Sequence, residues 1–214
     1  MKRLVLMIVP VLISGMILTS CSSDMEKQMD DSSVTIETAK IITTNIEIGD
    51  RDVAFVKAII TNMLCLETDA CRIEFEVAAS KFQNGGFEVN FFEDVPDEYL
   101  EPLFVDNGFT ISDNQAKIGI VILYAFDSAG RRIGNFEMMS SIGNDNYWSF
   151  SSVYADRSFT MKGKTEYGLE VDYSFNKGWN MIYYYHGGAN YYTTQKPSNV
   201  DFKCFFPIPI RCGS

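Results

Sequence analysis

Tyr167-Gly-Leu-Glu-Val-Asp-Tyr-Ser-Phe175 alternates between large apolar and polar side chains along its length. In an extended chain Leu169 and Val171 fall on one side, while Glu170 and Asp172 fall on the other. This period of two is typical of a β-strand with one buried face and one solvated face. The stretch therefore predicts a strand of an all-β domain.

The residues that follow predict two more strands joined by turns. Asn176-Lys177-Gly178 has turn composition, and residues 179–186 are rich in aromatic side chains that favour strands. Gly187-Gly188 predicts a two-residue hairpin turn, from which residues 189–195 return.

A two-residue turn fixes the register of this hairpin. It pairs Tyr184 with Tyr191 and places both rings on a face that also carries polar groups. The residues predicted to meet a ligand on this face are Asn180, Tyr184, His186 and Tyr191. Rings beside hydrogen-bonding groups suit a glycan, but they also suit a protein contact or an ordinary sheet surface.

Similar alternation recurs along most of the chain from Val34 onward. Residues 116–126 are apolar on both faces apart from Lys117, as expected of a central strand covered from two sides. Residues 162–164 are expected to form a turn. Short strands with hairpin turns and no long helix predict an antiparallel β-sandwich of residues 34–214, with a closed β-barrel as the alternative. The predicted strands span 53–61, 72–82, 87–92, 116–126, 131–139, 147–155, 158–162, 167–175, 179–186, 189–195 and 201–206.

Four segments combine turn residues with aromatic or charged neighbours. They are Asn84-Gly-Gly-Phe87, Pro96-Asp-Glu-Tyr-Leu100, Asp127-Ser-Ala-Gly-Arg-Arg-Ile-Gly134 and Phe175-Asn-Lys-Gly-Trp-Asn180. Together they resemble segments of small surface lipoproteins of gut-type anaerobic bacteria. The resemblance implies an immunoglobulin- or transthyretin-like β-sandwich at the cell surface. It implies no functional residues, because that family has no established activity.

The N-terminus has the features of an export signal with a lipid attachment site. Lys2-Arg3 precedes an apolar run over residues 4–18, which is shorter than the ~20 residues that span a bilayer. Leu18-Thr-Ser-Cys21 resembles the lipobox of bacterial lipoproteins, in which the cysteine is acylated and the chain is cut before it. We therefore expect a signal peptide over residues 1–20, and a lipidated Cys21 with a flexible acidic tether over residues 21–33. The alternative is an ordinary cleaved secretory signal.

The acidic composition excludes several partners. The formal charge of −10 falls to −12 once residues 1–20, with Lys2 and Arg3, are removed. Phosphates of nucleic acids and anionic membrane faces repel such a chain. We therefore expect no nucleic-acid partner and membrane attachment through the lipid on Cys21 alone. The expected location is the outer membrane, on its periplasmic face or at the cell surface.

The cysteines indicate an oxidising compartment. Apart from Cys21, the chain has Cys65, Cys71, Cys204 and Cys212, an even number that suits an exported protein. Three pairings are possible, and short separations favour disulfide bonds Cys65–Cys71 and Cys204–Cys212. The spacings do not match structural zinc sites, whose paired ligands are about two to four residues apart.

Nothing in the sequence indicates catalysis, a metal or a cofactor. His186 is the only histidine, and a polar residue before Gly187-Gly188 needs no special explanation. The acidic residues form no local pair typical of glycoside hydrolases. Asp106-Asn-Gly108 and Ser112-Asp-Asn114 lack the pattern of a calcium loop, and turn formation accounts for them. We therefore expect no catalytic residue.

Three classes of function remain open. The first is a non-catalytic surface module that binds a protein or a glycan. The second is a structural or assembly subunit joined to its neighbours by edge strands. The third and least supported is a hydrolase. A concave aromatic face would favour a glycan ligand, and a cluster of carboxylates in a cleft would favour a hydrolase.

The lipid anchor gives a testable prediction. Replacing the acceptor, Cys21→Ser, should give a soluble or uncleaved protein, because the predicted domain has neither a spanning segment nor a basic surface helix. Membrane fractionation and gel mobility measure the outcome, with Ser23→Ala as the control that keeps the anchor. A Cys21→Ser protein that is cleaved normally and still sediments with membranes would contradict the prediction.

Overall fold

The computed structural model describes residues 32–37, 39–61, 74–92, 94–103, 108–140, 146–164, 168–187 and 190–207. The predicted signal peptide and Cys21 lie outside the described residues, and so do Cys65, Cys71 and Cys212. The expectations on them stay predictions. The described part contains no helix with the length and apolar character that crossing a membrane requires.

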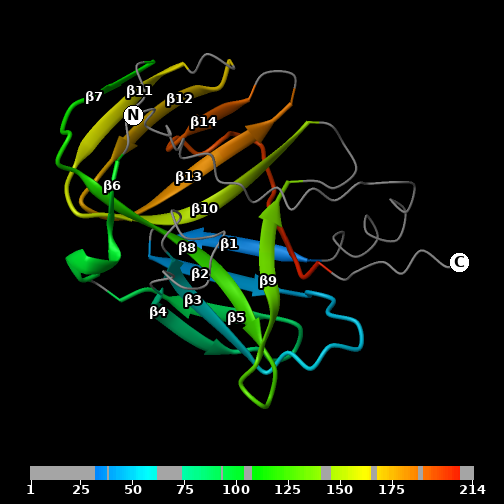
Figure 1. The fold of residues 1–214 in the computed structure, drawn as a ribbon. Coiled ribbons are helices and arrows are strands. Elements are labelled where there is room, and N and C mark those ends of the chain that lie inside the picture. The colour runs from blue at the N-terminus through cyan, green and yellow to red at the C-terminus, as the bar shows by residue number, and fades with distance from the viewer. Residues whose placement is uncertain are drawn as a thin grey trace, which may run out of the picture.

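The described chain is almost entirely β-structure (Figure 1). Pro96 precedes a short 3₁₀ turn, η3 (Asp97–Tyr99), in agreement with the single helical turn that proline and acidic residues predict there. The strands are β1 (Ser33–Glu37), β2 (Lys40–Thr44), β3 (Phe55–Thr61), β4 (Glu74–Lys81), β5 (Phe87–Asn90), β6 (Glu101–Pro102), β7 (Phe109–Ile111), β8 (Lys117–Phe126), β9 (Arg132–Met139), β10 (Tyr147–Ala155), β11 (Phe159–Lys164), β12 (Glu170–Phe175), β13 (Gly178–His186), β14 (Tyr191–Thr193) and β15 (Lys203–Phe205).

These strands form two sheets that pack as a β-sandwich, which confirms the predicted fold class (Figure 1). The smaller sheet is antiparallel and has the order β1-β2-β5. The larger sheet has the order β4-β3-β8-β9-β10-β13-β14-β12-β11-β7, while β6 pairs with β8 and β15 pairs with β9. The sheets are not closed into a barrel, so the sandwich is the correct one of the two predicted architectures.

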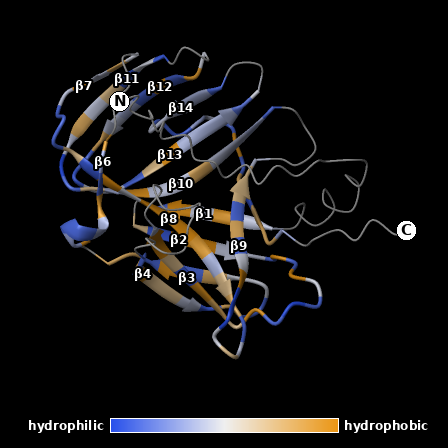
Figure 2. Ribbon diagram, in the orientation of Figure 1, coloured by the Kyte–Doolittle hydropathy of each residue, from blue (hydrophilic) through white to orange (hydrophobic). Residues whose placement is uncertain are grey.

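Strand β8 connects the two halves of the larger sheet. Its first half pairs with β6 and β10, and its second half pairs with β3 and β9. Both faces are buried, as predicted: Leu123 and Ala125 belong to one apolar core, and Ile118 and Ile120 belong to another. Figure 2 shows hydrophobic colouring along much of β8. The strand therefore separates two cores.

The two cores have different boundaries. The first lies between the smaller and larger sheets, where Ile41 of β2 and Val89 of β5 are buried with Val56 of β3. The second contains side chains from β8, β10, β11, β12, β13 and β14, all of which belong to the larger sheet. That sheet therefore curves around the second core and covers the face of β13 that carries Ile182 and Tyr184.

The strand order near the C-terminus differs from a series of simple hairpins. The turn at residues 176–178 joins β12 to β13 as predicted, but the two strands diverge beyond it. Strand β14 lies between them, antiparallel to β13 and parallel to β12. Hairpin signals in the sequence do not indicate this insertion, because they indicate only antiparallel pairing of consecutive strands, whereas β14 also pairs in parallel with β12.

The predicted turn at residues 162–164 is wrong. Gly163 lies inside β11, paired with Val171 of β12 and with Phe109 of β7. A Cβ atom at Gly163 would lie 2.1 Å from the backbone oxygen of Gly108. Glycine is required here because two backbones approach closely, which is one of the usual roles of glycine within a strand.

This close approach predicts a large effect of a single methyl group. We expect Gly163→Ala to lower the free energy of unfolding by about 3 kcal/mol, because the backbone of β7 must move away. Urea unfolding measures the change. The exposed Thr160 lies in the same strand, and we expect Thr160→Ala to cost less than about 1 kcal/mol. Equal stability of the two variants would contradict the role of Gly163.

Candidate functional site

One end of β10, β13 and β14 carries a group of half-buried aromatic side chains. Their rings alternate between the two faces of the sheet, because successive residues of a strand point to opposite sides. The group consists of Tyr147, Trp148, Tyr185, His186 and Tyr191. Two of its members, His186 and Tyr191, are among the residues predicted to meet a ligand.

The register of β13 and β14 differs from the prediction by one residue. Tyr184 pairs with Tyr192, and Tyr185 pairs with Tyr191. The connection between the strands is therefore longer than the two-residue turn predicted from Gly187-Gly188. A one-residue shift moves every side chain of a strand to the other face. The predicted exposed pair of Tyr184 and Tyr191 is wrong, because Tyr191 shares a face with Tyr185.

Tyr184 lies in the second core. It is 3% exposed, and its ring packs edge to face on Tyr192 with the centroids 4.8 Å apart. Burial raises the pKa of the Tyr184 hydroxyl far above its usual value. The sequence suggests that this face of β13 is solvated, but the curved sheet covers it.

Asn180 is also buried, and its polar atoms hold the turn between β12 and β13. Its residue exposure is 8%. The Nδ2 group donates to the carbonyl oxygens of Asn176 and Gly178 at 2.7 and 2.9 Å. The Oδ1 atom accepts from the backbone N–H of Asn176 at 2.9 Å. These contacts give Asn180 a structural role in the turn.

Trp148, Tyr185 and Tyr191 lie in one row across β10, β13 and β14. The ring of Trp148 contacts that of Tyr185, with centroids 5.2 Å apart and planes at 48°. It also contacts the ring of Tyr191, at 6.5 Å and 84°. We call these three half-buried rings the aromatic corner.

The aromatic corner continues the first core to the molecular surface. In the next row of the same face, Phe150 and Tyr183 are buried, and Phe202 packs on their rings with centroids 4.9 and 5.8 Å away. Alternation along β13 assigns Tyr185 to this apolar face but cannot show where burial ends. For the same reason the sequence does not single out Trp148; only the cross-strand register could have identified it.

Two exposed asparagines lie beside the aromatic corner. The Tyr185 hydroxyl donates to Oδ1 of Asn146 at 3.2 Å. Asn190 directly precedes Tyr191, and its Oδ1 accepts a long hydrogen bond of 3.5 Å from the N–H of Gly187. Both bonds use amide oxygens, whereas the Nδ2 groups are additional donors near the rings. The corner therefore combines apolar ring surface with uncharged hydrogen-bonding groups.

His186 lies on the opposite face of the sheet. Its ring stacks on Tyr147 with centroids 4.4 Å apart, and its Nε2 shares a 2.9 Å hydrogen bond with the Ser149 hydroxyl. Partial burial lowers the pKa of His186, which keeps the imidazole neutral at neutral pH.

A hydroxyl and a neutral imidazole are two of the three groups of a nucleophilic triad. The third is a carboxylate that orients the imidazole. Among the described residues, no ion pair or hydrogen bond joins His186 to an Asp or Glu. Burial raises the pKa of Glu137 on β9, and burial together with the nearby Glu137 carboxylate raises the pKa of Tyr147. Within the part of the chain that the structure describes, the Ser149–His186 contact has no carboxylate hydrogen-bonded to the imidazole to orient it.

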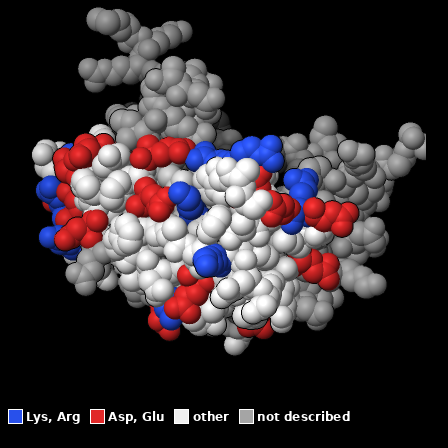
Figure 3. Space-filling model, turned by 90° about the horizontal axis from the view of Figure 1, so that it is seen from below, with Lys and Arg blue, Asp and Glu red and all other residues white. Residues whose placement is uncertain are grey.

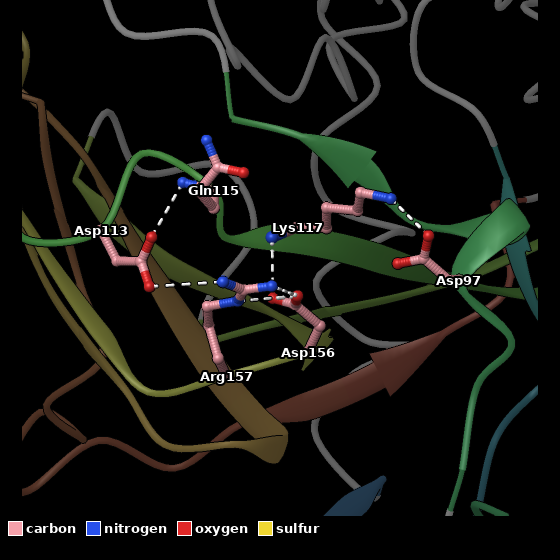
Figure 4. A network of polar contacts seen from close by, with 6 residues as sticks. All are labelled: Asp97, Asp113, Gln115, Lys117, Asp156 and Arg157. Carbon is pink, nitrogen blue, oxygen red and sulfur yellow. Dashed lines mark hydrogen bonds and ion pairs between the residues drawn. The ribbon is translucent and has the colours of Figure 1, made fainter.

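A second polar cluster connects β8 to its neighbours (Figure 4). The Asp156 carboxylate accepts hydrogen bonds from the backbone N–H of Lys117 at 2.8 Å and from the Arg157 guanidinium at 2.9 Å. Arg157 also reaches Asp113 at 3.5 Å, and the Lys117 ammonium pairs with Asp97. Each cation is already paired with a carboxylate, which indicates a structural network.

On the face of the molecule seen in Figure 3, Lys and Arg side chains lie close to Asp and Glu side chains. Ion pairs on β3, β4 and β9 have this character, namely Lys57 with Glu76 and Arg132 with Glu74, each at 2.7 Å. Exposed pairs of this kind contribute little to stability. Interspersed charges also leave this face without the extended single-sign patch that favours a charged partner.

Cys204 lies in β15, and its side chain is fully buried. Burial raises the pKa of this thiol well above its usual value. Its predicted disulfide partner, Cys212, lies outside the described residues, so the pairing stays a prediction. Within the described ranges, no group of three or more His, Cys, Asp or Glu side chains is positioned to hold a metal ion.

Comparison with known proteins gives no family assignment. No protein-family model, curated protein or solved structure matches the chain. Its function has to be inferred from its own residues.

The hydrogen bonds of Asn180 lead to a prediction about stability. We expect Asn180→Ala to lower the free energy of unfolding by about 2 kcal/mol, because it removes the buried Asn180 side chain and its three hydrogen bonds to the turn. Urea unfolding measures the change. Asn190→Ala, at an exposed position, is the matched control and should cost about 0.5 kcal/mol or less. An Asn180→Ala variant as stable as the control would rule out the structural role.

Proposed function

We propose that this chain is a lipid-anchored, non-catalytic surface module that binds a glycan at the aromatic corner. The observation that carries the proposal is the contact of three half-buried rings, Trp148, Tyr185 and Tyr191, at the end of a sheet beside the exposed amides of Asn146 and Asn190. The proposed location is the outer membrane, with the fold held away from the lipid by a tether that ends before Ser32 and β1, because Ser32 is buried and Ser33 begins that strand.

The chemistry of sugars matches this combination of groups. Each pyranose ring has apolar C–H faces that pack on aromatic rings, and hydroxyls at its edge that need hydrogen-bonding partners. Tryptophan and tyrosine provide large apolar surfaces with few rotatable bonds, so that little conformational entropy is lost on binding. The amides of Asn146 and Asn190 can both donate to and accept from hydroxyls.

The aromatic corner is also organised before a ligand arrives. Trp148 packs against the first core, and the Tyr185 hydroxyl is held by Asn146. Rings that are already fixed by packing and hydrogen bonds need little rearrangement on binding, which favours affinity.

A hydrolase is the second candidate, and the Ser149–His186 hydrogen bond is the observation that favours it. It receives less support than glycan binding because hydrolysis also requires an oriented imidazole and donors for the developing oxyanion. A protein ligand at the same rings is the remaining alternative, and the experiment below separates it from a glycan.

The glycan proposal predicts that substitutions in the aromatic corner weaken glycan binding, whereas a substitution on the opposite face of the sheet does not. The full chain, purified in a detergent without sugar head groups, should bind glycans on an array. Trp148→Ala and Tyr191→Ala should each weaken binding about tenfold, which corresponds to ~1.4 kcal/mol. Tyr147→Ala is the matched control, because Tyr147 is half-buried on the same strand but faces the opposite side; its binding should stay unchanged.

Thermal unfolding of each variant verifies that the fold is retained. Failure of the parent chain to bind any glycan would reject the proposal. Equal binding by the parent and by folded Trp148→Ala and Tyr191→Ala variants would show that the aromatic corner is not the binding site.

A further inference from the structure

The angles between the three rings restrict the shape of a ligand. The planes of Trp148 and Tyr191 meet at 84°, and those of Trp148 and Tyr185 meet at 48°. Rings at such angles cannot all lie flat against one planar surface. A flat face of a crystalline polysaccharide could therefore stack on only one of them, whereas a single chain can turn its sugar units to meet rings of different orientation.

The charges near the aromatic corner restrict the chemistry of the ligand. The rings and the flanking amides are uncharged, and Glu170, which is exposed, is the register partner of Tyr191 on β12. Lys162 lies near Tyr191, but its ammonium is paired with Asp172 at 2.8 Å. An acidic sugar at the corner would meet the carboxylate of Glu170, which neighbours Tyr191, before it reached Lys164, the register partner of Glu170 one strand further away on β11. It would also enter the field of a chain with a formal charge of −10.

From these two restrictions we infer that the aromatic corner binds a single, electrically neutral glycan chain, and that it rejects both insoluble polysaccharide surfaces and acidic glycans. This inference rests on the proposed function and specifies its ligand class. Trp148 and Tyr191 provide two differently oriented stacking surfaces, while Glu170 provides the discrimination against anionic sugars.

The experiment compares three kinds of probe with the full chain in a detergent without sugar head groups. Neutral soluble oligosaccharides are represented by hexamers of glucose, xylose, mannose and N-acetylglucosamine, and acidic ones by a hexamer of galacturonic acid. Insoluble surfaces are represented by microcrystalline cellulose and chitin powder. We expect at least one neutral hexamer to bind, the acidic hexamer to bind at least tenfold more weakly, and the powders not to deplete the protein from solution.

A charge-neutral substitution tests the role of Glu170 directly. Glu170→Gln should strengthen binding of the acidic hexamer at low salt and leave binding of the neutral hexamer unchanged. Glu98→Gln, which removes an acidic side chain in η3 on a different part of the chain, is the matched control and should change neither. Because both substitutions keep side-chain size at exposed positions, the variants are expected to fold.

The outcomes separate the inference from the proposed function. Depletion by cellulose or chitin that is lost in Trp148→Ala, or acidic binding as strong as neutral binding, would overturn the inference while glycan binding itself stands. Absence of an effect of Glu170→Gln on the acidic hexamer would overturn the assigned discrimination. No binding of any carbohydrate probe would overturn the proposed function and the inference with it.

Discussion

The burial of β8 on both faces is the constraint on which the rest of the structure depends. A strand with apolar side chains on both sides needs a cover on each, and the chain provides them differently. The smaller sheet contributes the cover on one side, and the curved part of the larger sheet forms the cover on the other. Because β8 pairs with β3 and β9 in one half and with β10 in the other, the two halves can diverge and curve separately. The curved half then places the ends of β10, β13 and β14 at the surface.

Much of the fold could be predicted from local patterns. The apolar run at 116–126 correctly indicates a central strand. Asn84-Gly85 forms a turn with positive φ angles, but the hairpin expected there is wrong, because β4 and β5 on either side belong to different sheets. The insertion of β14 between β12 and β13 could not be predicted, because turn signals indicate pairing of consecutive strands, whereas β14 also pairs in parallel with β12. The sequence predicts a turn at Gly163, because composition does not distinguish a glycine in a turn from a glycine that allows close approach of a neighbouring backbone.

The candidate site shows how a small error of register changes a functional prediction. The sequence correctly indicates that the tyrosines around residues 183–192 are paired across two strands, but Gly187-Gly188 suggests a shorter connection than the structure has. The shift by one residue exchanges Tyr184 for Tyr185 as the neighbour of Tyr191. Trp148 could not be identified, because its position beside Tyr185 requires the pairing of β10 with β13. Asn180 was a reasonable ligand candidate by residue type, yet its polar atoms are used by the turn.

The aromatic corner has a property that both a core and a binding site require, namely rings fixed by packing. The same face of β10 and β13 carries buried rings at Phe150 and Tyr183 and half-buried rings one row further on. Trp148 is fixed because it extends that core, and a fixed ring is what a stacking contact with a ligand requires. Mobile surface loops would lose more conformational entropy on binding than rings held by a sheet. A binding surface that extends an aromatic core can therefore be rigid without a deep pocket, and its ring orientations, set by the twist between strands, define the ligands that it can accept.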